Sequence, residues 1–244
     1  MDILYIVGTG SKWDNNELRY SLRSIEKYGR NIGRVFIVGH KPDFVSDEVT
    51  YIPCKDKYNR KHKNILYKVI TAIEKSDISK HFIVSSDDHF YTREVDFDNF
   101  PVYYQARVIQ TEPGEGKKRN NYHRSLEDTK AMLERWGLPT YQTNPHCNTH
   151  FDADVYRLYF PLFSEALAKE YGGEMNCLMG NILIHNGAKP QRFIDKKIGA
   201  FADAADLINQ IGGVECFSIS DEAILCGVGG YLQTMYPNKS KYEK

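Results

Sequence analysis

Two adjacent carboxylates, Asp87 and Asp88, follow directly after the apolar run Phe82–Val84 and two serines. If this run is a buried strand, both carboxylates lie at the rim of a sheet. Their mutual repulsion there raises the pKa of one of them and favours a bound cation. Mg²⁺ and Mn²⁺ bind one or two protein carboxylates and complete their coordination with phosphate oxygens and water. An isolated Asp-Asp pair is more often a solvated turn, but the strand-end position favours a metal site that holds a diphosphate.

A glycine-rich loop follows the first apolar run of the chain, Ile3–Val7. The backbone N–H groups of Gly8, Thr9 and Gly10 can approach a phosphate closely. The loop has neither the lysine of a P-loop nor a complete dinucleotide-binding fingerprint. It therefore predicts a phosphate contact without specifying the nucleotide.

Basic side chains supply further predicted phosphate contacts. Arg19 and Arg23 lie one turn apart on an expected helix, and an arginine can bind a phosphate through two N–H groups. Lys63 ends a basic run that starts at Lys55, and a second basic run covers residues 117–119. Taken alone, such runs are more often a solvated surface.

The second half of the chain holds the residues that we expect to act on an acceptor. The polar segment His146–Asp154 contains two histidines and two aspartates, His150 and Asp152 among them, and a histidine with a carboxylate suits a general base or the completion of a metal shell. Asp221 follows another apolar run and repeats the pattern of a strand that ends in carboxylates. Glu174, which follows two glycines, is a candidate base together with Asp152 and His150. We predict that the segment 146–154 and the pair 221–222 converge on the same cleft as Asp88, and Glu174 is the remaining candidate if they do not. An ordinary loop is the alternative for the polar segment.

Hydrophobic periodicity predicts the elements that position these residues. Short apolar runs and helical patterns alternate in the first half, which is the order that a helix-covered, mostly parallel sheet produces. Such sheets bind ligands at the carboxyl ends of their strands. The expected strands are 3–7, 35–38, 49–52 and 82–84, and the expected helices are 18–28 and 65–73.

The second half has weaker periodicity. Ser125 and Asp128 resemble a capping box that opens a helix, and Pro161 should interrupt another. The tail after Tyr236 is polar, and we expect it to be loose. The remaining expected elements are a strand at 102–109, a polar loop at 111–124, helices at 125–136, 155–167 and 203–211, and a strand at 214–219.

Composition restricts the class of protein. Lysine and arginine number 32, aspartate and glutamate also 32, and the formal net charge of +0 argues against a surface that binds nucleic acid over its whole extent. The five cysteines are widely spaced, which argues against a zinc site or a disulfide framework and favours a reducing compartment. No run approaches the ~20 apolar residues of a membrane span. We therefore expect a cytoplasmic protein without such a span.

Several segments resemble the Stealth proteins, which are sugar-1-phosphate transferases of bacterial capsule synthesis and of lysosomal-enzyme tagging. Residues 16–28 with 35–38 resemble the second conserved region of that family, and 82–90 is similar to its closing strand and Asp-Asp pair. Residues 146–155 and 216–221 resemble the third and fourth regions. Where the family has an opening Asp-Gly-Ser-Asp type motif, this chain has Gly8–Trp13, which contains no carboxylate.

The chain also looks like a compact glycosyltransferase of the GT-A type, of which small stand-alone versions occur in phages. The resemblance implies an α/β, GT-A-like (Rossmann-like) fold, a mostly parallel sheet flanked by helices. It implies a UDP-sugar donor, a divalent metal (Mn²⁺ or Mg²⁺), and the cytoplasm of a bacterial or phage-infected host cell. We expect one transferase domain, 1–244, in which 1–110 binds the nucleotide sugar and 111–244 supplies the acceptor and catalytic half.

The expected reaction is transfer of a sugar to an acceptor hydroxyl on a saccharide, a protein or a modified nucleobase. Glycosyl transfer is preferred because the opening acid of the Stealth proteins is absent. Sugar-1-phosphate transfer is the first alternative, and a phage-type glycosyltransferase acting on modified DNA bases is another. A DNA-directed modifier that binds DNA through its basic loops is possible but not favoured, and a non-catalytic sugar-nucleotide-binding protein is the last alternative.

Overall fold

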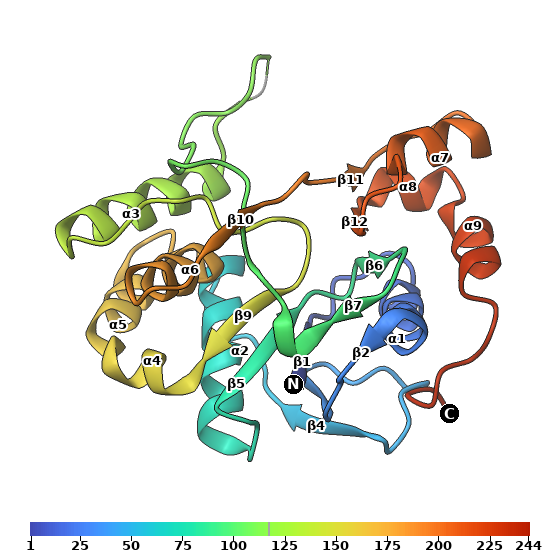
Figure 1. The fold of residues 1–244 in the computed structure, drawn as a ribbon, viewed down its shortest axis with the longest axis horizontal. Coiled ribbons are helices and arrows are strands. Elements are labelled where there is room, and N and C mark those ends of the chain that lie inside the picture. The colour runs from blue at the N-terminus through green and yellow to red at the C-terminus, as the bar shows by residue number, and fades with distance from the viewer. Residues whose placement is uncertain (117) are drawn as a thin grey trace.

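A five-stranded sheet with the order β4-β3-β1-β5-β9 forms the centre of the computed structural model, which describes residues 1–116 and 118–244. Lys117, in the second basic run, lies outside the described residues. Four of the strands are parallel, and β9 runs antiparallel beside β5 (Figure 1). The predicted α/β fold with a mostly parallel sheet is confirmed. The strands are β1 (Asp2–Val7), β3 (Val35–Gly39), β4 (Val49–Pro53), β5 (His81–Ser85) and β9 (Thr149–Asp152).

Helices cover both faces of this sheet because side chains alternate along each strand. On β1, Leu4 faces a core shared with α2 (Lys61–Lys75), whereas Ile3 and Tyr5 face a second core shared with α1 (Asn16–Tyr28). The first core also takes in α3 (Asn121–Arg135), α4 (Ala153–Leu158), α5 (Phe160–Ala168) and α6 (Met175–His185).

A smaller sheet with the order β11-β12-β6 stands beside the main one, on the opposite side from α3 to α6 (Figure 1). It carries a third apolar core, which includes Phe90 and Phe217. Its strands are β6 (His89–Tyr91), β11 (Lys197–Ile198) and β12 (Cys216–Ile219), and its helices are α7 (Ala204–Ile211), α8 (Asp221–Leu225) and α9 (Val228–Met235). Two short strand pairs complete the fold. In the first, β2 (Gly29–Arg30) pairs with β7 (Val95–Asp96), and β7 is followed by a 3₁₀ turn (Phe97–Asn99). In the second, β8 (Val102–Tyr104) pairs with β10 (Pro190–Arg192).

The elements expected in the first half are all present, but the second half differs in detail. The strand expected at 102–109 ends at Tyr104, and α6, α8, α9 and β9 were not anticipated. The capping box at Ser125 was wrong: α3 begins at Asn121, and Asn120 accepts hydrogen bonds from the backbone N–H groups of Tyr122 and His123. The interruption near Pro161 is confirmed, since α4 ends and α5 begins there. Among the described residues, no helix combines the length and apolar composition that crossing a membrane requires.

The chain after Tyr236 is packed, contrary to the expected loose tail. The side chain of Glu243 is 0% exposed and accepts hydrogen bonds from Arg19 (2.8 Å) and from two nitrogens of Arg23 (2.8 and 2.9 Å). Burial acts to raise the pKa of Glu243, but hydrogen bonds from the arginines and a serine outweigh it, so this pKa lies below its usual 4.5. The ion cluster fastens the tail to α1.

We predict that Glu243→Gln destabilises the protein by about 2–3 kcal/mol at pH 7, because it leaves two partly buried guanidinium groups without a charged partner. Since the folded-state pKa is lowered, the difference from the wild type is complete above pH 4.5 and is lost as the pH falls through the folded-state value. Urea denaturation at several pH values measures this. Glu94→Gln, which removes the carboxylate of an ion pair with Arg30 that is 63% exposed on both sides, is the control and should cost under about 1 kcal/mol. Equal losses in the two variants would contradict the prediction.

Candidate active site

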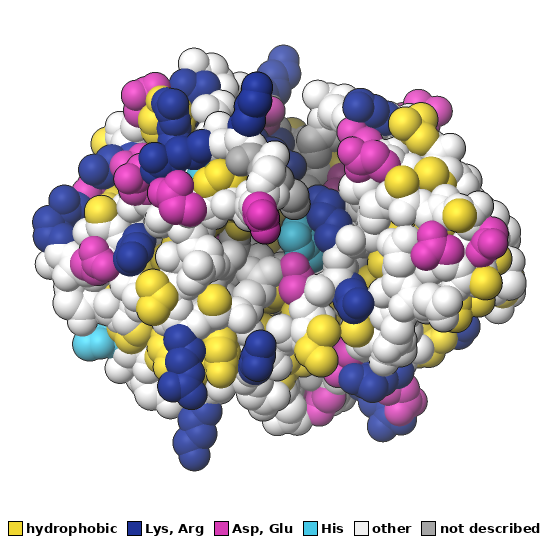
Figure 2. Space-filling model, turned by 90° about the horizontal axis from the view of Figure 1, so that it is seen from above, with side chains coloured by type: hydrophobic (Ala, Val, Ile, Leu, Met, Phe, Trp, Pro, Cys, Tyr) yellow, Lys and Arg dark blue, Asp and Glu magenta, His cyan; other side chains and the backbone are white. Residues whose placement is uncertain are grey.

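The carboxyl ends of the four parallel strands meet at one edge of the main sheet. Val84 of β5 pairs with Thr149 of β9, so the segment that leads into β9 reaches the same edge. The N-termini of α1 and α2 also point here, because each helix follows the end of a parallel strand. Figure 2, which views the molecule from above, shows this face hollowed between two lobes, with acidic, basic and histidine side chains on its walls.

Asp87 and Asp88 lie at this edge, in the turn between β5 and β6. Both are half-buried, and the Asp88 side chain is 24% exposed. Burial first, and then the charges of Asp88 and Glu17, raise the pKa of Asp87 above its usual range. The turn thus concentrates negative charge in a partly dry place, where a cation is favoured.

Hydrogen bonds from α1 and from the segment before β9 hold the residues next to this turn in place. His89 Nδ1 lies 3.1 Å from Asn148 Oδ1, which also accepts a hydrogen bond from Ser85 Oγ (3.0 Å). Ser21 of α1 donates to the His89 carbonyl at 2.7 Å. Because an amide oxygen only accepts, Nδ1 carries the proton, and Nε2 faces Asp88 Oδ1 at 3.8 Å. Burial lowers the pKa of His89 despite the neighbouring Asp88, so Nε2 of the neutral ring offers a lone pair beside the carboxylates.

These residues fit a divalent cation that shares its coordination with a phosphate ligand. Oε2 of Glu17 and Nδ2 of Asn148 are buried without a hydrogen-bond partner, which leaves polar groups of the site unsatisfied. Within the described part of the chain, no three acidic, histidine or cysteine side chains are grouped closely enough to hold a metal by themselves. Two carboxylates are what Mg²⁺ or Mn²⁺ takes when diphosphate oxygens and water supply the rest.

The glycine-rich loop is also at this edge. Gly8 is half-buried, Thr9 and Gly10 are exposed, and the loop turns into α1 through Ser11 Oγ, which accepts hydrogen bonds from the N–H groups of Trp13 and Asn15 (3.1 and 2.9 Å). An added Cβ at Gly10 would have nothing within 4 Å, so the backbone there is open to a ligand.

Asp221 lies across from this loop, where it pairs with Lys12 at 2.8 Å. Its side chain is 56% exposed, and the hydrogen bond from Lys12 lowers its pKa. A carboxylate that is exposed, paired and stabilised in its charged form is a weak proton acceptor. Asp221 therefore reaches the rim of the site as a partner of Lys12.

Three basic residues expected to bind phosphate are engaged elsewhere: Arg19, Arg23 and Lys63. Arg19 and Arg23 both bind Glu243 and tie down the tail, which leaves neither guanidinium free for a phosphate. Lys63, in the first turn of α2, donates to the carbonyl of Lys169 at 3.0 Å. Its neighbour Lys61 is the basic residue that acts on the carboxylates, since its charge opposes the raised pKa of Asp87.

His150 and Asp152 do not converge on this cleft, and that expectation was wrong. Because β9 is antiparallel to β5, Asp152 pairs with His81 at the start of β5, about 13 Å along the strand from its carboxyl end. There Asp152 caps α4 and forms an ion pair with His81 at 2.9 Å. His150 Nε2 contacts the carbonyl of Phe100, and burial lowers the pKa of this histidine.

Glu174 lies nearer to the edge, but its carboxylate caps α6. It accepts a hydrogen bond from the N–H of Cys177 at 2.9 Å, and burial raises its pKa to about 6. Two residues later Asn176 accepts a hydrogen bond from Thr149 at 3.0 Å, which connects the start of α6 to the end of β5. The carboxylate of Glu174 itself is buried, so it does not face an acceptor directly.

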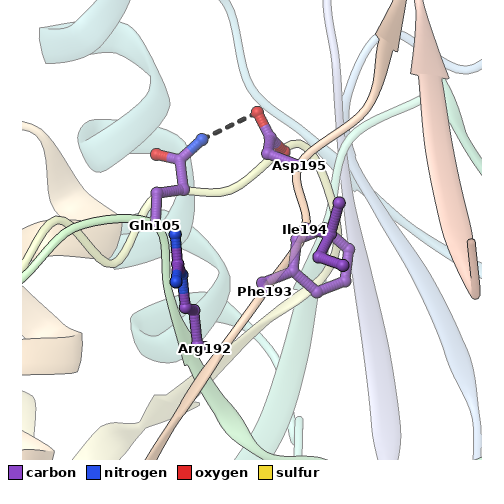
Figure 3. A pocket seen from close by; sticks show the side chains of 5 residues that line it. All are labelled: Gln105, Arg192, Phe193, Ile194 and Asp195. Atoms are coloured by element: carbon purple, nitrogen blue, oxygen red, sulfur yellow. Dashed lines mark hydrogen bonds between the residues drawn. The ribbon is translucent and has the colours of Figure 1, made fainter.

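His146 and Asp195 form a pair, of which sequence reasoning had placed only His146 in the polar segment and had not considered Asp195. His146 Nδ1 lies 2.6 Å from Asp195 Oδ2, and the His146 N–H donates to the other carboxylate oxygen at 2.6 Å. Gln105 donates to Asp195 at 2.7 Å (Figure 3). His146 lies two residues before Asn148, which is hydrogen-bonded to His89 and Ser85, so the pair lies beside the carboxylate turn. The partners are 49 residues apart, so no local pattern could have joined them.

Comparison with known proteins gives one sequence match and a shared fold, and no protein-family model matches the chain. The chain is 29% identical over 146 residues to the exopolysaccharide phosphotransferase CpsY of Mycobacterium leprae, a match that covers 54% of this chain and 27% of that protein. It thus spans about a quarter of the length of this relative, whose similarity supports the predicted resemblance to sugar-phosphate transferases.

Among solved structures, the chain resembles the galactosyltransferase LgtC. A complex of LgtC with donor and acceptor sugar analogues has a TM-score of 0.54 at 12% identity, covering 99% of this chain and 97% of that one. An active-site mutant of LgtC gives 0.51 at 12% identity, with 99% and 98% covered. Both named relatives are transferases, and at this identity the structures establish the fold: the chain has the GT-A fold, as predicted.

Proposed function

We propose that this protein is a metal-dependent glycosyltransferase that moves a sugar from a nucleotide sugar, a UDP-sugar, to an acceptor hydroxyl. The observation that carries the proposal is the half-buried Asp87-Asp88 pair at the strand-end edge of a GT-A fold. Parallel α/β sheets bind their ligands at this edge. The sequence similarity to a phosphotransferase supports sugar transfer in general.

Different residues at this edge bind the metal and the phosphates of the donor. Asp87 and Asp88 hold a divalent metal, which, when bound, neutralises the charge that develops on the diphosphate leaving group. The N–H groups of Gly8, Thr9 and Gly10 and the N-terminal ends of α1 and α2 face the phosphates with positive dipoles. Lys61 adds a full positive charge near Asp87.

Sugar-1-phosphate transfer is the second candidate, because the sequence match is to a phosphotransferase and the Stealth-like segments include the Asp87-Asp88 turn. Against it stands the Gly8–Trp13 loop, which lacks the opening acid of those proteins. Product analysis separates the two reactions. Release of the nucleoside diphosphate from the donor supports glycosyl transfer, whereas release of the nucleoside monophosphate with a phosphodiester product supports sugar-1-phosphate transfer.

We predict that Asp88→Asn folds normally but loses metal-dependent turnover of the donor by about 100-fold or more, because the amide keeps the shape and removes the charge that holds the cation. The measurement is donor hydrolysis or transfer over a panel of nucleotide sugars, with and without Mn²⁺. Unchanged turnover at saturating Mn²⁺ would exclude a catalytic metal at this residue.

Asp87→Asn should stabilise the ligand-free protein at pH 8 by about 1 kcal/mol, because burial and like charges raise the pKa of Asp87 and its ionised form opposes folding. The penalty develops as the pH rises above 3.8, the usual value, so the gain disappears in acid. Thermal unfolding in EDTA measures the gain, and the variant should no longer be stabilised by Mn²⁺ with UDP. Asp47→Asn, at a side chain that is 99% exposed, is the control and should change nothing. A loss of stability in Asp87→Asn alone would refute the proposed repulsion.

A further inference from the structure

We propose that the pocket beside His146 and Asp195 is the acceptor subsite, that His146 accepts the proton of the acceptor hydroxyl, and that Arg192 binds an oxyanion on the acceptor. The acceptor would then be an acidic saccharide that carries a carboxylate or a phosphate ester. This inference rests on the proposed function and adds the acceptor class and the general base to it.

The pocket has the size and lining of a small-ligand site. Its volume is about 600 Å³, which is within the usual range for such sites, and it is lined by Gln105, Arg192, Phe193, Ile194 and Asp195. The short β8–β10 pair, in which Tyr104 lies opposite Arg192, forms its base. Figure 3 shows Gln105 and Arg192 on one side and Ile194 and Asp195 on the other.

The chain that carries this lining leads directly to the donor edge. After β10 it continues into β11, crossing from the side of α6 to the smaller sheet (Figure 1). There the Lys196 carbonyl accepts a hydrogen bond from the N–H of Ser218 at 2.9 Å, and Ser218 pairs with His89. Asp195 therefore precedes a residue bonded to β12, and β12 pairs with β6, which begins directly after Asp88. We infer from this connection that an acceptor in the pocket faces a donor held by Asp88.

His146 has the geometry of a general base. Asp195 holds Nδ1, so the neutral ring carries its proton there and leaves Nε2 as the acceptor. Burial acts to raise the pKa of Asp195, but hydrogen bonds from His146 and Gln105 outweigh it and the pKa is lowered, which keeps Asp195 ionised. His146 adjoins the pocket through its hydrogen bond to Asp195, which lines it, and the His146 side chain is 40% exposed, so a ligand can reach the ring.

The transfer step balances with these groups. Nε2 of His146 takes the proton as the acceptor oxygen forms its bond to the anomeric carbon of the donor sugar. The bond from that carbon to the diphosphate oxygen breaks, and its electron pair leaves with the nucleoside diphosphate. The imidazolium then gives the proton to water. The same deprotonation would serve an attack on phosphorus in the second candidate reaction.

Arg192 is the residue that makes the pocket favour an anionic acceptor. It is exposed at the pocket, and among residues 1–116 and 118–244 it forms no salt bridge, whereas Asp195 is already bound by His146 and Gln105. Lys196 and Lys197 follow in the same segment and add positive charge. A guanidinium group binds carboxylate and phosphate through paired hydrogen bonds, so an acceptor that carries either group is favoured over a neutral one.

Acceptor binding tests the charge preference without any turnover. Saturation-transfer NMR with the metal-free protein should show that methyl glucuronide and methyl glucoside 6-phosphate bind about 10- to 100-fold more tightly than methyl glucoside, the scale of one charged hydrogen-bonded contact. Arg192→Met should abolish this preference, whereas Arg157→Met, at an exposed arginine on α4, should keep it. The tighter of the two anionic probes identifies carboxylate or phosphate as the natural group. Equal binding of all three probes, no binding of either anion, or an unchanged preference in Arg192→Met would overturn the acceptor assignment.

Kinetic measurements test the role of His146 as the general base. His146→Asn should lower kcat for transfer by about 100-fold or more, the contribution of a general base, while binding of UDP with Mn²⁺ stays unchanged. Asp195→Asn, which acts through His146, should lower kcat with little change in donor KM and shift the pH dependence of kcat. If both variants transfer sugar at the wild-type rate, His146 is not the base. Absence of donor binding or turnover in the wild type would instead refute the proposed function, and the binding experiment above would still decide the acceptor pocket.

Discussion

Electrostatic repulsion between Asp87 and Asp88 is the constraint on which the arrangement of the candidate site depends. Two carboxylates in a half-buried turn, with Glu17 behind them, repel one another, and burial removes the water that would otherwise screen them. The fold does not relieve this by exposing the turn. It fixes the turn through His89, Asn148 and Ser85, and it directs two helix N-termini toward the same edge. In the proposed function, the positive charge of a divalent metal would offset this repulsion.

The strand-end position of Asp87 and Asp88 was predictable because its signals are local. An apolar run followed by carboxylates marks a strand end wherever it occurs, and parallel strands bring their ends to one edge. The expectations for the second half failed where long-range pairing decides. Because β9 runs antiparallel to β5, Asp152 lies at the opposite end of β5 from the carboxylate turn. The hydrophobic pattern of a four-residue strand does not reveal whether the strand runs parallel or antiparallel to its neighbour.

Long-range charge pairing explains the other differences. Arg19 and Arg23 have the spacing of a phosphate clamp, but a carboxylate some 220 residues later satisfies both. In the sequence, His146 is one polar residue among several, and its pairing with Asp195, 49 residues later, is visible only in the tertiary structure. The type of each side chain was informative in every case. Its role depended on a partner that only the tertiary structure could supply.

The path of the chain from β10 to β11 connects the two halves of the proposed chemistry. Arg192 and Asp195 lie on one short segment that is anchored at each end by strand pairing, to β8 on one side and to β12 on the other. Because β12 also pairs with β6, this segment is joined through one strand to the residues that follow Asp88. A ligand that binds the segment and a diphosphate that binds the carboxylate turn therefore act on one connected set of strands. If both ligands bind as proposed, this connection would hold the acceptor hydroxyl and the donor sugar in a fixed relative position, and such positioning supplies much of the rate of a two-substrate transferase.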